Sequence, residues 1–449
     1  MTKRLLWYLL GLATFVGLLT SCAKDEKFTQ ISSLSFSGAP SSPAPGQTHK
    51  LQVKTFPAGA DEPYTLVFTS SKPTVATVDE LGTITALQEG QTVISVSLKD
   101  RPEVKAEFTL TVKPLYKAPK NTQFQKVGYF PSYRDLAAMP DEFLQMYTVA
   151  CYSFATLNAD YTLTVEKPDK LREFVTRCKS LGIKVLICFG GGGSGADGSY
   201  ATMAASPENR AKFIASLKTI VETYDLDGVD NDWEYPLGSD GSGQGNLLLM
   251  KELAKKCREG RRQYYLTAAI TPGKYVGNAT AGIPDELFDY VDWFNVMVYD
   301  DYSETREGMH HSTYDLMLES VDYWVGQRGL PLSKFVVGLP AYGVPSGIRR
   351  SGNTRDYNGI IRAGGSCMGD VAMITSTQHP SPYPVYYNGI RTIRAKTAYA
   401  LGNGLGGVMF WEIAGDRHDD LSLVAAAYDQ VQSQEAASPS KEEKRGKRK

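Results

Sequence analysis

The sequence predicts two folded units, a small all-β sandwich followed by an α/β unit with an eight-stranded (β/α)8 barrel. A length of 449 residues exceeds one ordinary domain and suits a barrel of about 250 to 300 residues plus a smaller module. Residues 31–114 contain short alternating segments without helical periodicity, which is typical of a sandwich. Residues 124–432 alternate strand-like runs with longer helical patterns, which indicates a parallel sheet with crossover helices.

The overall composition argues against several classes of partner. The formal net charge is -1 and the isoelectric point is near 6.6, so no basic surface for nucleic acid is expected. Five histidines without paired cysteines give no transition-metal cluster, and we expect neither metal nor cofactor. After Cys22 the cysteines are odd in number and form no CxxC pair, so a disulfide framework is not expected. We expect Cys151, Cys178 and Cys188 to be small buried hydrophobic residues in a monomer.

The first residues form a predicted targeting segment. Two basic residues precede an apolar run from Leu5 to Leu19, which is too short and wrongly flanked for a membrane span. Leu19-Thr20-Ser21-Cys22 resembles the bacterial lipobox, which implies that a signal peptide of residues 1–21 is removed and that Cys22 is lipidated. An ordinary secretory signal with a chance cysteine is the alternative. Residues 22–30 would be a tether, and their Ala23 to Glu26 stretch resembles the signal that sends some Gram-negative lipoproteins to the cell surface, anchored in the outer membrane.

The sandwich region has its own resemblance. Strand-like runs such as Val93 to Leu98 and Phe108 to Val112 are separated by turns. Thr69 to Asp79, followed by Gly82 to Leu87, resembles a bacterial immunoglobulin-like group 2 domain, which implies an immunoglobulin-like fold for residues 31–114. A spacer role is favoured over sugar binding, because no acid pair or row of aromatic residues stands out. Residues 115–123 are the predicted linker.

The barrel region contains eight candidate strands, the number that a closed barrel needs. Functional side chains are expected at their carboxyl ends. Residues 433–449 are polar and end in a basic run, which predicts a disordered tail. The candidate strands are Lys126 to Phe130, Tyr147 to Ala155, Lys184 to Phe189, Leu226 to Glu234, Tyr264 to Ile270, Val291 to Tyr299, Phe335 to Ala341 and Gly406 to Trp411.

The fourth candidate strand has acids where aliphatic residues are expected. On a strand, Asp230, Asp232 and Glu234 project to one side about 7 Å apart, whereas Asp227 has the opposite parity. Desolvation and like charge raise the proton affinity of such a group, so Glu234, nearest the carboxyl end, is the candidate general acid. A calcium loop or a solvated acidic run is the alternative, and the apolar residues between the acids argue against both.

These acids, with Tyr235-Pro236 after them, resemble the DxxDxDxE-Tyr-Pro signature of glycoside hydrolase family 18, the chitinase family. The resemblance implies a TIM barrel with this segment as strand four. It also implies that Glu234 is the general acid/base and that Asp232 holds the acetamido group of the substrate. Asp230 would share charge with Asp232, and Asp227 would brace the strand.

Other strand ends match the same family. Gly128-Tyr129-Phe130 and Ser153-Phe154-Ala155 resemble its first two strands, and Met297-Val298-Tyr299-Asp300 resembles its MxYD motif at strand six. The resemblance implies that Tyr299 hydrogen-bonds the acetamido oxygen. Segments around Tyr342 and Trp411 resemble strands seven and eight, and Trp411 would form the floor under the sugar. The implied substrate-binding residues are Tyr129, Phe154, Met297, Asp300, Tyr342 and Trp411.

Three features depart from the family pattern. Cys188 replaces the serine of the SxGG that ends strand three, ahead of Gly190 and Gly191, and a thiol is a weaker hydrogen-bond donor. Asn231 stands at an aliphatic position and must find a partner beneath the helices. Strands seven and eight are roughly 65 residues apart, which predicts that the α+β insertion of some members is absent, leaving a shallow, endo-acting cleft.

The predicted function is hydrolysis of β-1,4 linkages in chitin or other N-acetylglucosamine-containing glycans by retaining, substrate-assisted catalysis. An endo-β-N-acetylglucosaminidase acting on N-glycans is one alternative. A non-catalytic, glycan-binding surface lipoprotein is another, and the retained Glu234 argues against it.

Overall fold

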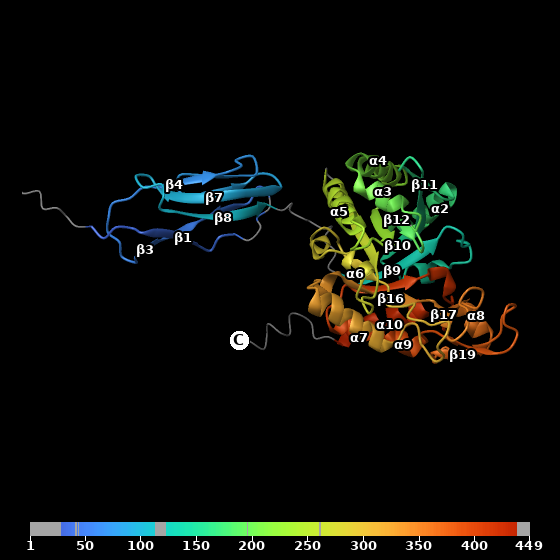
Figure 1. Cartoon of the computed structure of the whole chain (residues 1–449). Helices are drawn as coiled ribbons and strands as arrows, with labels where there is room; N and C mark the ends of the chain where they lie inside the picture. Colours follow the sequence, from blue (N-terminus) through green and yellow to red (C-terminus); the bar gives the residue numbers. More distant parts are fainter. Residues whose placement is uncertain are drawn as a thin grey trace, which may run out of the picture. The chain divides into compact units, whose positions relative to one another are not determined.

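The computed structural model describes residues 28–40, 43, 45–112, 123–194, 196–259 and 262–437 (Figure 1). The chain divides into two compact units, Met1–Leu115 and Tyr116–Lys449. The predicted signal peptide, Cys22 and most of the predicted tether and linker lie outside the described residues. Over the described ranges, no helix combines the length and apolarity needed to cross a membrane.

Over its described residues, the first unit contains strands and no helices. β7 alternates buried and partly exposed residues, so that Ile94, Val96 and Leu98 face the interior, as expected for a strand with one packed face. Three sheets pair β1 with β3, β2-β6-β5, and β4-β7-β8. The strands are β1 (Ser33–Ser37), β2 (Thr48–Lys50), β3 (Gln52–Phe56), β4 (Leu66–Ser70), β5 (Ala76–Val78), β6 (Thr83–Ala86), β7 (Gly90–Leu98) and β8 (Lys105–Val112).

The second unit contains a closed parallel barrel, as predicted. Each barrel strand pairs in parallel with the next, and β9 pairs with both β10 and β21, which closes the ring. β11 (Leu163–Val165) adds an antiparallel strand to β10. The barrel strands are β9 (Gln125–Pro131), β10 (Val149–Leu157), β12 (Lys184–Gly191), β13 (Gly228–Trp233), β14 (Tyr265–Ile270), β15 (Phe294–Val296), β16 (Phe335–Pro340) and β21 (Gly407–Trp411).

Helices surround the barrel and cover the outward side chains of its strands (Figure 1). On α2, Phe174 stacks on Phe130 of β9 with ring centroids 4.8 Å apart. The helices are α1 (Asp141–Leu144), α2 (Pro168–Ser180), α3 (Ser199–Ala205), α4 (Pro207–Thr223), α5 (Ser242–Arg258), α6 (Asn278–Ala281), α7 (Tyr314–Val321), α9 (Ile390–Gly402) and α10 (Leu423–Ala437), with short turns η1 (Asp285–Asp289), η2 (Asp322–Gln327), η3 (Leu332–Lys334) and η4 (Ile413–Gly415).

Asn231 is satisfied beneath these helices, as predicted. Its Nδ2 donates to Asn246 Oδ1 of α5 at 2.9 Å, and its Oδ1 accepts the Trp233 N–H at 3.1 Å. The other face of β13 points into the barrel, where a smaller cluster of inward residues includes Cys151, Cys188 and Met409. All three predicted buried cysteines are indeed buried.

The prediction that an insertion is absent between strands seven and eight was wrong. A four-stranded antiparallel sheet of order β18-β17-β20-β19 lies there, with one helix (orange in Figure 1). Because its strands have only two to four residues, the insertion fits between strands seven and eight of the barrel. The reason for expecting a shallow cleft is therefore removed. Its elements are β17 (Tyr342–Pro345), β18 (Arg355–Asp356), α8 (Tyr357–Arg362), β19 (Val371–Ile374) and β20 (Tyr383–Tyr386).

Two element boundaries also differ from the sequence prediction. β15 contains only Phe294–Val296, because the chain turns after it: the Val298 N–H donates to Val296 O and the Tyr299 N–H to Met297 O. At the other end, α10 continues through Ala437, so residues 433–437 belong to a helix and not to the predicted tail. The remainder of that tail lies outside the described residues.

Candidate active site

A cavity of about 310 Å³ opens at the carboxyl ends of the barrel strands. Eight of its lining residues were predicted from the sequence, and they come from β9, β13, β21 and the segments after β13, β15 and β16. They are Tyr129, Asp232, Glu234, Met297, Tyr299, Asp300, Tyr342 and Trp411. Six lining residues were not predicted as site residues: Gly192, Tyr235, Ala269, Pro272, Arg350 and Met409.

Asp230 lies deepest in the row of acids and is fully buried. Its Oδ2 accepts hydrogen bonds from Tyr129 Oη at 2.7 Å and from Cys188 Sγ at 3.1 Å. Its Oδ1 accepts from Thr267 Oγ1 and from Asn295 Nδ2. Burial raises the pKa of Asp230, and the four donors act against that rise. Its oxygens are therefore fully engaged by the barrel interior.

Asp232 has a different environment two residues further along the strand. No hydrogen-bond donor of the described residues reaches its buried Oδ1. Burial, then the charges of Glu234 and Asp230, hold the pKa of Asp232 well above its ordinary value. Without a donor or a cation to stabilise the anion, Asp232 favours its neutral form.

Glu234 lies just past the end of β13, partly buried at the cavity wall. Burial raises its pKa, the charge of Asp300 adds to the rise, and a hydrogen bond with Tyr235 and the charge of Arg350 oppose it. Its backbone N–H donates to Ser194 Oγ at 3.3 Å, in the glycine-rich loop after β12. A protonated carboxyl group that faces a cavity is the arrangement that general-acid chemistry requires.

Asp227 lies at the start of the same strand, away from the cavity. Its Oδ2 accepts the backbone N–H of Val185 at 3.0 Å, which joins it to β12. Lys184 and Arg262 each approach its Oδ1 at 3.7 Å. Asp227 therefore links neighbouring strands.

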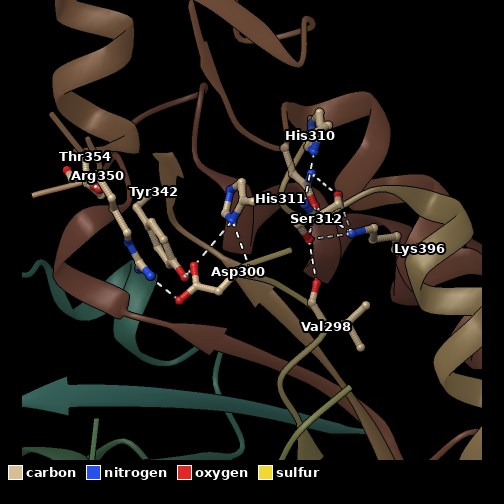
Figure 2. A network of polar contacts seen from close by, with 10 residues as sticks. Val298, Asp300, His310, His311, Ser312, Tyr342, Arg350, Thr354 and Lys396 are labelled. Carbon is tan, nitrogen blue, oxygen red and sulfur yellow. Dashed lines mark hydrogen bonds and ion pairs between the residues drawn. The ribbon is translucent and has the colours of Figure 1, made fainter. Parts of the chain in front are cut away.

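Asp300 lies in a cluster of donors and cations, shown in Figure 2. Tyr342 Oη donates to its Oδ1 at 2.7 Å, and Arg350 Nη2 lies 2.9 Å from its Oδ2. Although burial alone would raise the pKa of Asp300, His311, Arg350 and Tyr342 together hold it below the ordinary value. Asp300 is therefore an anion at the cavity wall.

Aromatic rings form another part of the site. Trp411 packs against Tyr129, with ring centroids 5.5 Å apart, and against Phe154 at 6.0 Å. Tyr299 meets Tyr342 edge to face at 6.1 Å. Phe154 is not among the residues that line the cavity; it supports Trp411.

Gly190 and Gly191 leave no space for side chains. Both have positive φ, 101° and 95°. A Cβ on Gly190 would lie 2.3 Å from the Asp232 carbonyl oxygen, and one on Gly191 would lie 2.7 Å from the Phe154 ring. The two glycines therefore allow the close approach of β12 to the acid strand and to the aromatic residues.

Several contributing residues were missed in the sequence. Thr267 and Asn295 are polar residues within apolar strands, and their inward parity is a signal that could have identified them as partners of Asp230. Arg350 has no comparable signal, because it lies between β17 and β18 of the insertion and outside any motif. In the described part of the chain, no group of three or more His, Cys, Asp or Glu residues is arranged to hold a metal ion.

Relatives and solved structures agree with this architecture. A probable chitinase 10 of Drosophila melanogaster is 30% identical over 266 residues, covering 52% of this chain and 11% of that protein. A probable endochitinase of Caenorhabditis elegans is 29% identical over 275 residues, covering 54% and 44%. The chain thus spans less than half the length of these two relatives. Mouse chitotriosidase-1 is 27% identical over 310 residues, covering 59% and 66%.

Among solved structures, a chitinase from Bacteroides thetaiotaomicron superposes with a TM-score of 0.59 at 23% identity, covering 71% of this chain and all of that chain. A class V chitinase mutant from Nicotiana tobaccum in complex with NAG4 gives 0.58 at 24%, covering 69% and 99%. At this identity the likeness establishes the barrel fold alone.

Two family models match the sequence itself. The bacterial Ig-like domain (group 2) matches residues 32–108, within the all-β unit. The glycosyl hydrolases family 18 model matches residues 125–416, well over half of the chain, and includes every barrel strand and the acid row of β13. The chain belongs to glycosyl hydrolase family 18, with a bacterial Ig-like domain preceding its barrel.

Proposed function

We propose that this protein hydrolyses β-1,4 linkages between N-acetylglucosamine units of chitin or chitooligosaccharides, with retention of configuration. The observation that supports this most strongly is the contrast among the carboxyl groups. Glu234 faces the cavity with a raised pKa, while each neighbouring acid is otherwise committed. Asp230 is engaged by four donors, Asp232 favours its neutral form, and Asp300 is paired with Arg350.

This distribution matters because an ordinary retaining glycosidase needs a second, ionised carboxylate as nucleophile, about 5 Å from the acid. Asp232 is the neighbour of Glu234 on the strand, and its neutral form is a poor nucleophile but a good hydrogen-bonding partner. The proposed nucleophile is therefore the acetamido oxygen of the substrate itself. It would attack the anomeric carbon as the glycosidic bond breaks.

The proposed steps then follow in order. Glu234 gives its proton to the leaving oxygen, and the sugar becomes an oxazolinium ion. The Asp232 carboxyl group accepts a hydrogen bond from the acetamido N–H as positive charge develops, and the Tyr299 hydroxyl positions the acetamido oxygen. Glu234, now ionised, takes a proton from water. The water attacks the anomeric carbon and opens the oxazolinium ring. The enzyme is thereby returned to its starting protonation state.

Binding of the sugar is assigned to the rest of the cavity wall. Trp411 offers an aromatic face for the pyranose ring, supported from below by Tyr129 and Phe154. The Asp300 carboxylate would accept hydrogen bonds from sugar hydroxyl groups, and Met297 and Tyr342 complete the wall beside it. The relatives named as chitinases, and the NAG4 complex of the tobacco structure, support N-acetylglucosamine oligomers as the substrate class.

The test is to incubate the full-length protein and its Glu234→Gln variant with chitotetraose and with an N-glycosylated protein, and to identify products by mass spectrometry and NMR. We expect the wild type to release N-acetylglucosamine oligomers with retained anomeric configuration and the variant to release almost none. Inverted products, or equal cleavage of substrates without a 2-acetamido group, would refute the mechanism. Release of N-glycans alone would indicate an endo-β-N-acetylglucosaminidase, and binding without cleavage would indicate a lectin.

We also propose that Cys22 is lipidated and anchors the chain in the outer membrane of a Gram-negative cell. The support is the sequence Leu19-Thr20-Ser21-Cys22 after an apolar run with basic residues before it. Expression with an alkyne-labelled fatty acid should label the wild type but not Cys22→Ser. Cleavage of the labelled protein by protease added to intact cells would support surface exposure, whereas full protection would place it on the inner face.

A further inference from the structure

A buried lysine lies behind the sugar site and has no role in the mechanism above. Lys396 of α9 is 0% exposed, and its Nζ donates hydrogen bonds to Ser312 O at 2.9 Å, Ser312 Oγ at 2.8 Å and Asn388 Oδ1 at 2.8 Å. Among the described residues, no carboxylate forms an ion pair with it. Burial lowers the pKa of Lys396 to about 7. In its charged form the group has three N–H donors, and these three oxygens satisfy them.

Ser312 connects this lysine to the strand end that bears the site. Its hydroxyl accepts from Lys396 and donates to the Val298 carbonyl at 2.7 Å, as Figure 2 shows. Asn388 Nδ2 donates to the Ser312 carbonyl at 2.7 Å and fixes the same residue from a second direction. The Val298 carbonyl can only accept and is closer than the other acceptor, Asn388 Oδ1 at 3.3 Å, so the Ser312 proton points to Val298 and Lys396 Nζ donates to the hydroxyl oxygen. Val298 directly precedes Tyr299 and Asp300.

The residue before Ser312 holds the other side of Tyr299. His311 Nδ1 lies 3.3 Å from the Asp300 backbone nitrogen and 3.6 Å from its Oδ1. The His311 carbonyl accepts the Asp301 N–H at 3.0 Å. Residues 311–312 thus hold backbone groups on both sides of Tyr299.

His310 completes the cluster as a neutral ring. Its Nε2 lies 2.8 Å from the Tyr387 carbonyl, which can only accept, so Nε2 carries the proton. Its Nδ1 accepts the Ser312 N–H at 3.0 Å. Burial lowers the pKa of His310 to about 4, in agreement with this tautomer. His310 therefore fixes the Ser312 backbone as an acceptor, while Lys396 donates to the carbonyl and hydroxyl oxygens of the same residue.

We propose that Lys396 is a positioning residue of the sugar site: through Ser312 it fixes the backbone from Val298 to Asp301 and so places Tyr299 and Asp300 for the substrate. This inference rests on the function proposed above. Removal of the lysine would take one buried donor away from Ser312 O, Ser312 Oγ and Asn388 Oδ1, so its effect on folding is measured beside its effect on binding.

The experiment uses the full-length Glu234→Gln protein, in which binding can be measured without cleavage. Titration calorimetry with chitotetraose is compared for this protein and for the same protein with Lys396→Met, with Ser312→Ala, or with both. We expect each single change to raise Kd about five- to tenfold with a stoichiometry still near one, in line with the loss of one oriented contact. The double change should add little, because the two residues act in series.

Lys334→Met is the matched control. Lys334 also donates from a partly buried Nζ to backbone carbonyls, those of Phe288 and Val291, at the opposite end of the barrel strands. We expect its Kd to equal that of the parent protein. A merely structural role of Lys396 would lower the stoichiometry by leaving part of the protein unfolded, and would leave Kd unchanged.

Four results decide the inference. An unchanged Kd in both Lys396→Met and Ser312→Ala overturns it, as do additive effects in the double variant. If Lys396→Met does not fold, Ser312→Ala alone carries the test. If the Glu234→Gln parent does not bind chitotetraose, the proposed function is refuted, and so is this inference, which rests on it. If the parent binds and the variants bind equally well, only this inference is refuted.

Discussion

Two groups of acids share one cleft and have opposite electrostatic environments. In the β13 row, burial is the largest influence on Asp230, Asp232 and Glu234, and the pKa of each is raised. Beyond the end of β15, Asp300 is also partly buried, but Arg350 and Tyr342 lie within 3 Å and its pKa is lowered. The difference shows that burial alone does not set the charge of a carboxyl group; the partners placed around it do.

This division suits the proposed chemistry. A proton donor must remain neutral until the glycosidic oxygen takes its proton, whereas a group that binds sugar hydroxyls works best as an anion. The two requirements conflict within a single environment. The cleft meets them because, among the described residues, no cation forms an ion pair with the acid row, whereas Arg350 of the insertion pairs directly with Asp300.

The largest effect is expected from Glu234→Gln, which removes the proposed proton donor. The kcat for chitotetraose should fall about 10³-fold, the usual scale for loss of a general acid, with little change in KM. Steady-state kinetics checks this, with thermal unfolding as the control for folding. A loss below tenfold would show that another group supplies the proton.

Asp232→Asn should have the next largest effect. The substitution keeps the shape of the side chain but removes the carboxyl group that would stabilise the oxazolinium ion, so kcat should fall about 10²-fold. If Asp232 acts together with Glu234, the loss in kcat should be smaller for a substrate whose leaving group needs no protonation. The kcat losses are measured with a chitobioside of 4-methylumbelliferone and with chitotetraose. Equal losses would show that Asp232 acts independently of Glu234.

Arg350→Met tests the cationic side of the comparison. The arginine lowers the pKa of both Asp300 and Glu234, so its removal should raise both values. Glu234 would then stay protonated to higher pH, and the alkaline limb of kcat should move upward, while KM rises about five- to tenfold as Asp300 loses its partner. A pH profile of kcat and KM checks both; an alkaline limb that stays in place would contradict the assignment. Arg355→Met, on the same insertion, is the control.

Cys188→Ser should have the smallest effect. A hydroxyl group donates to Asp230 more strongly than the thiol does, and it should lower the pKa of that buried acid slightly. We expect kcat/KM to change by about two- to threefold, with the pH profile otherwise preserved. Replicate steady-state kinetics of wild type and variant on the same substrate would resolve such a change. A loss above tenfold would mean that the thiol has a role beyond this hydrogen bond.

The acid row was accessible from the sequence because strand parity and spacing already determine which carboxylates share a face. Asp230, Asp232 and Glu234 follow from a period of two, and Asp227 is excluded by the same rule. The early end of β15 could not be foreseen, since the apolar run continues to Tyr299 and only backbone turns stop the ladder. Arg350 was equally hidden, because its position depends on how the insertion folds back over Asp300.

Lys396 illustrates a further limit. In the sequence it is one basic residue on a helix, where the expected position is a solvated face. Its burial follows from the packing of α9 against the segment after β15, which brings Ser312 and Asn388 around the ammonium group. The contacts with Ser312 join residues 84 positions apart, and no local pattern reports them.

The insertion between β16 and β21 has a consequence for how this cleft could diverge. Tyr342 and Arg350 both belong to it, and neither takes part in the hydrogen-bonded ring of the barrel. Exchange of this one segment would alter the charge facing Asp300 while the strand with the proton donor remains in place. Part of the cavity wall and the strand that leads to Glu234 therefore lie on separate stretches of the chain, so a change in the insertion could alter the surroundings of Asp300 without replacing β13.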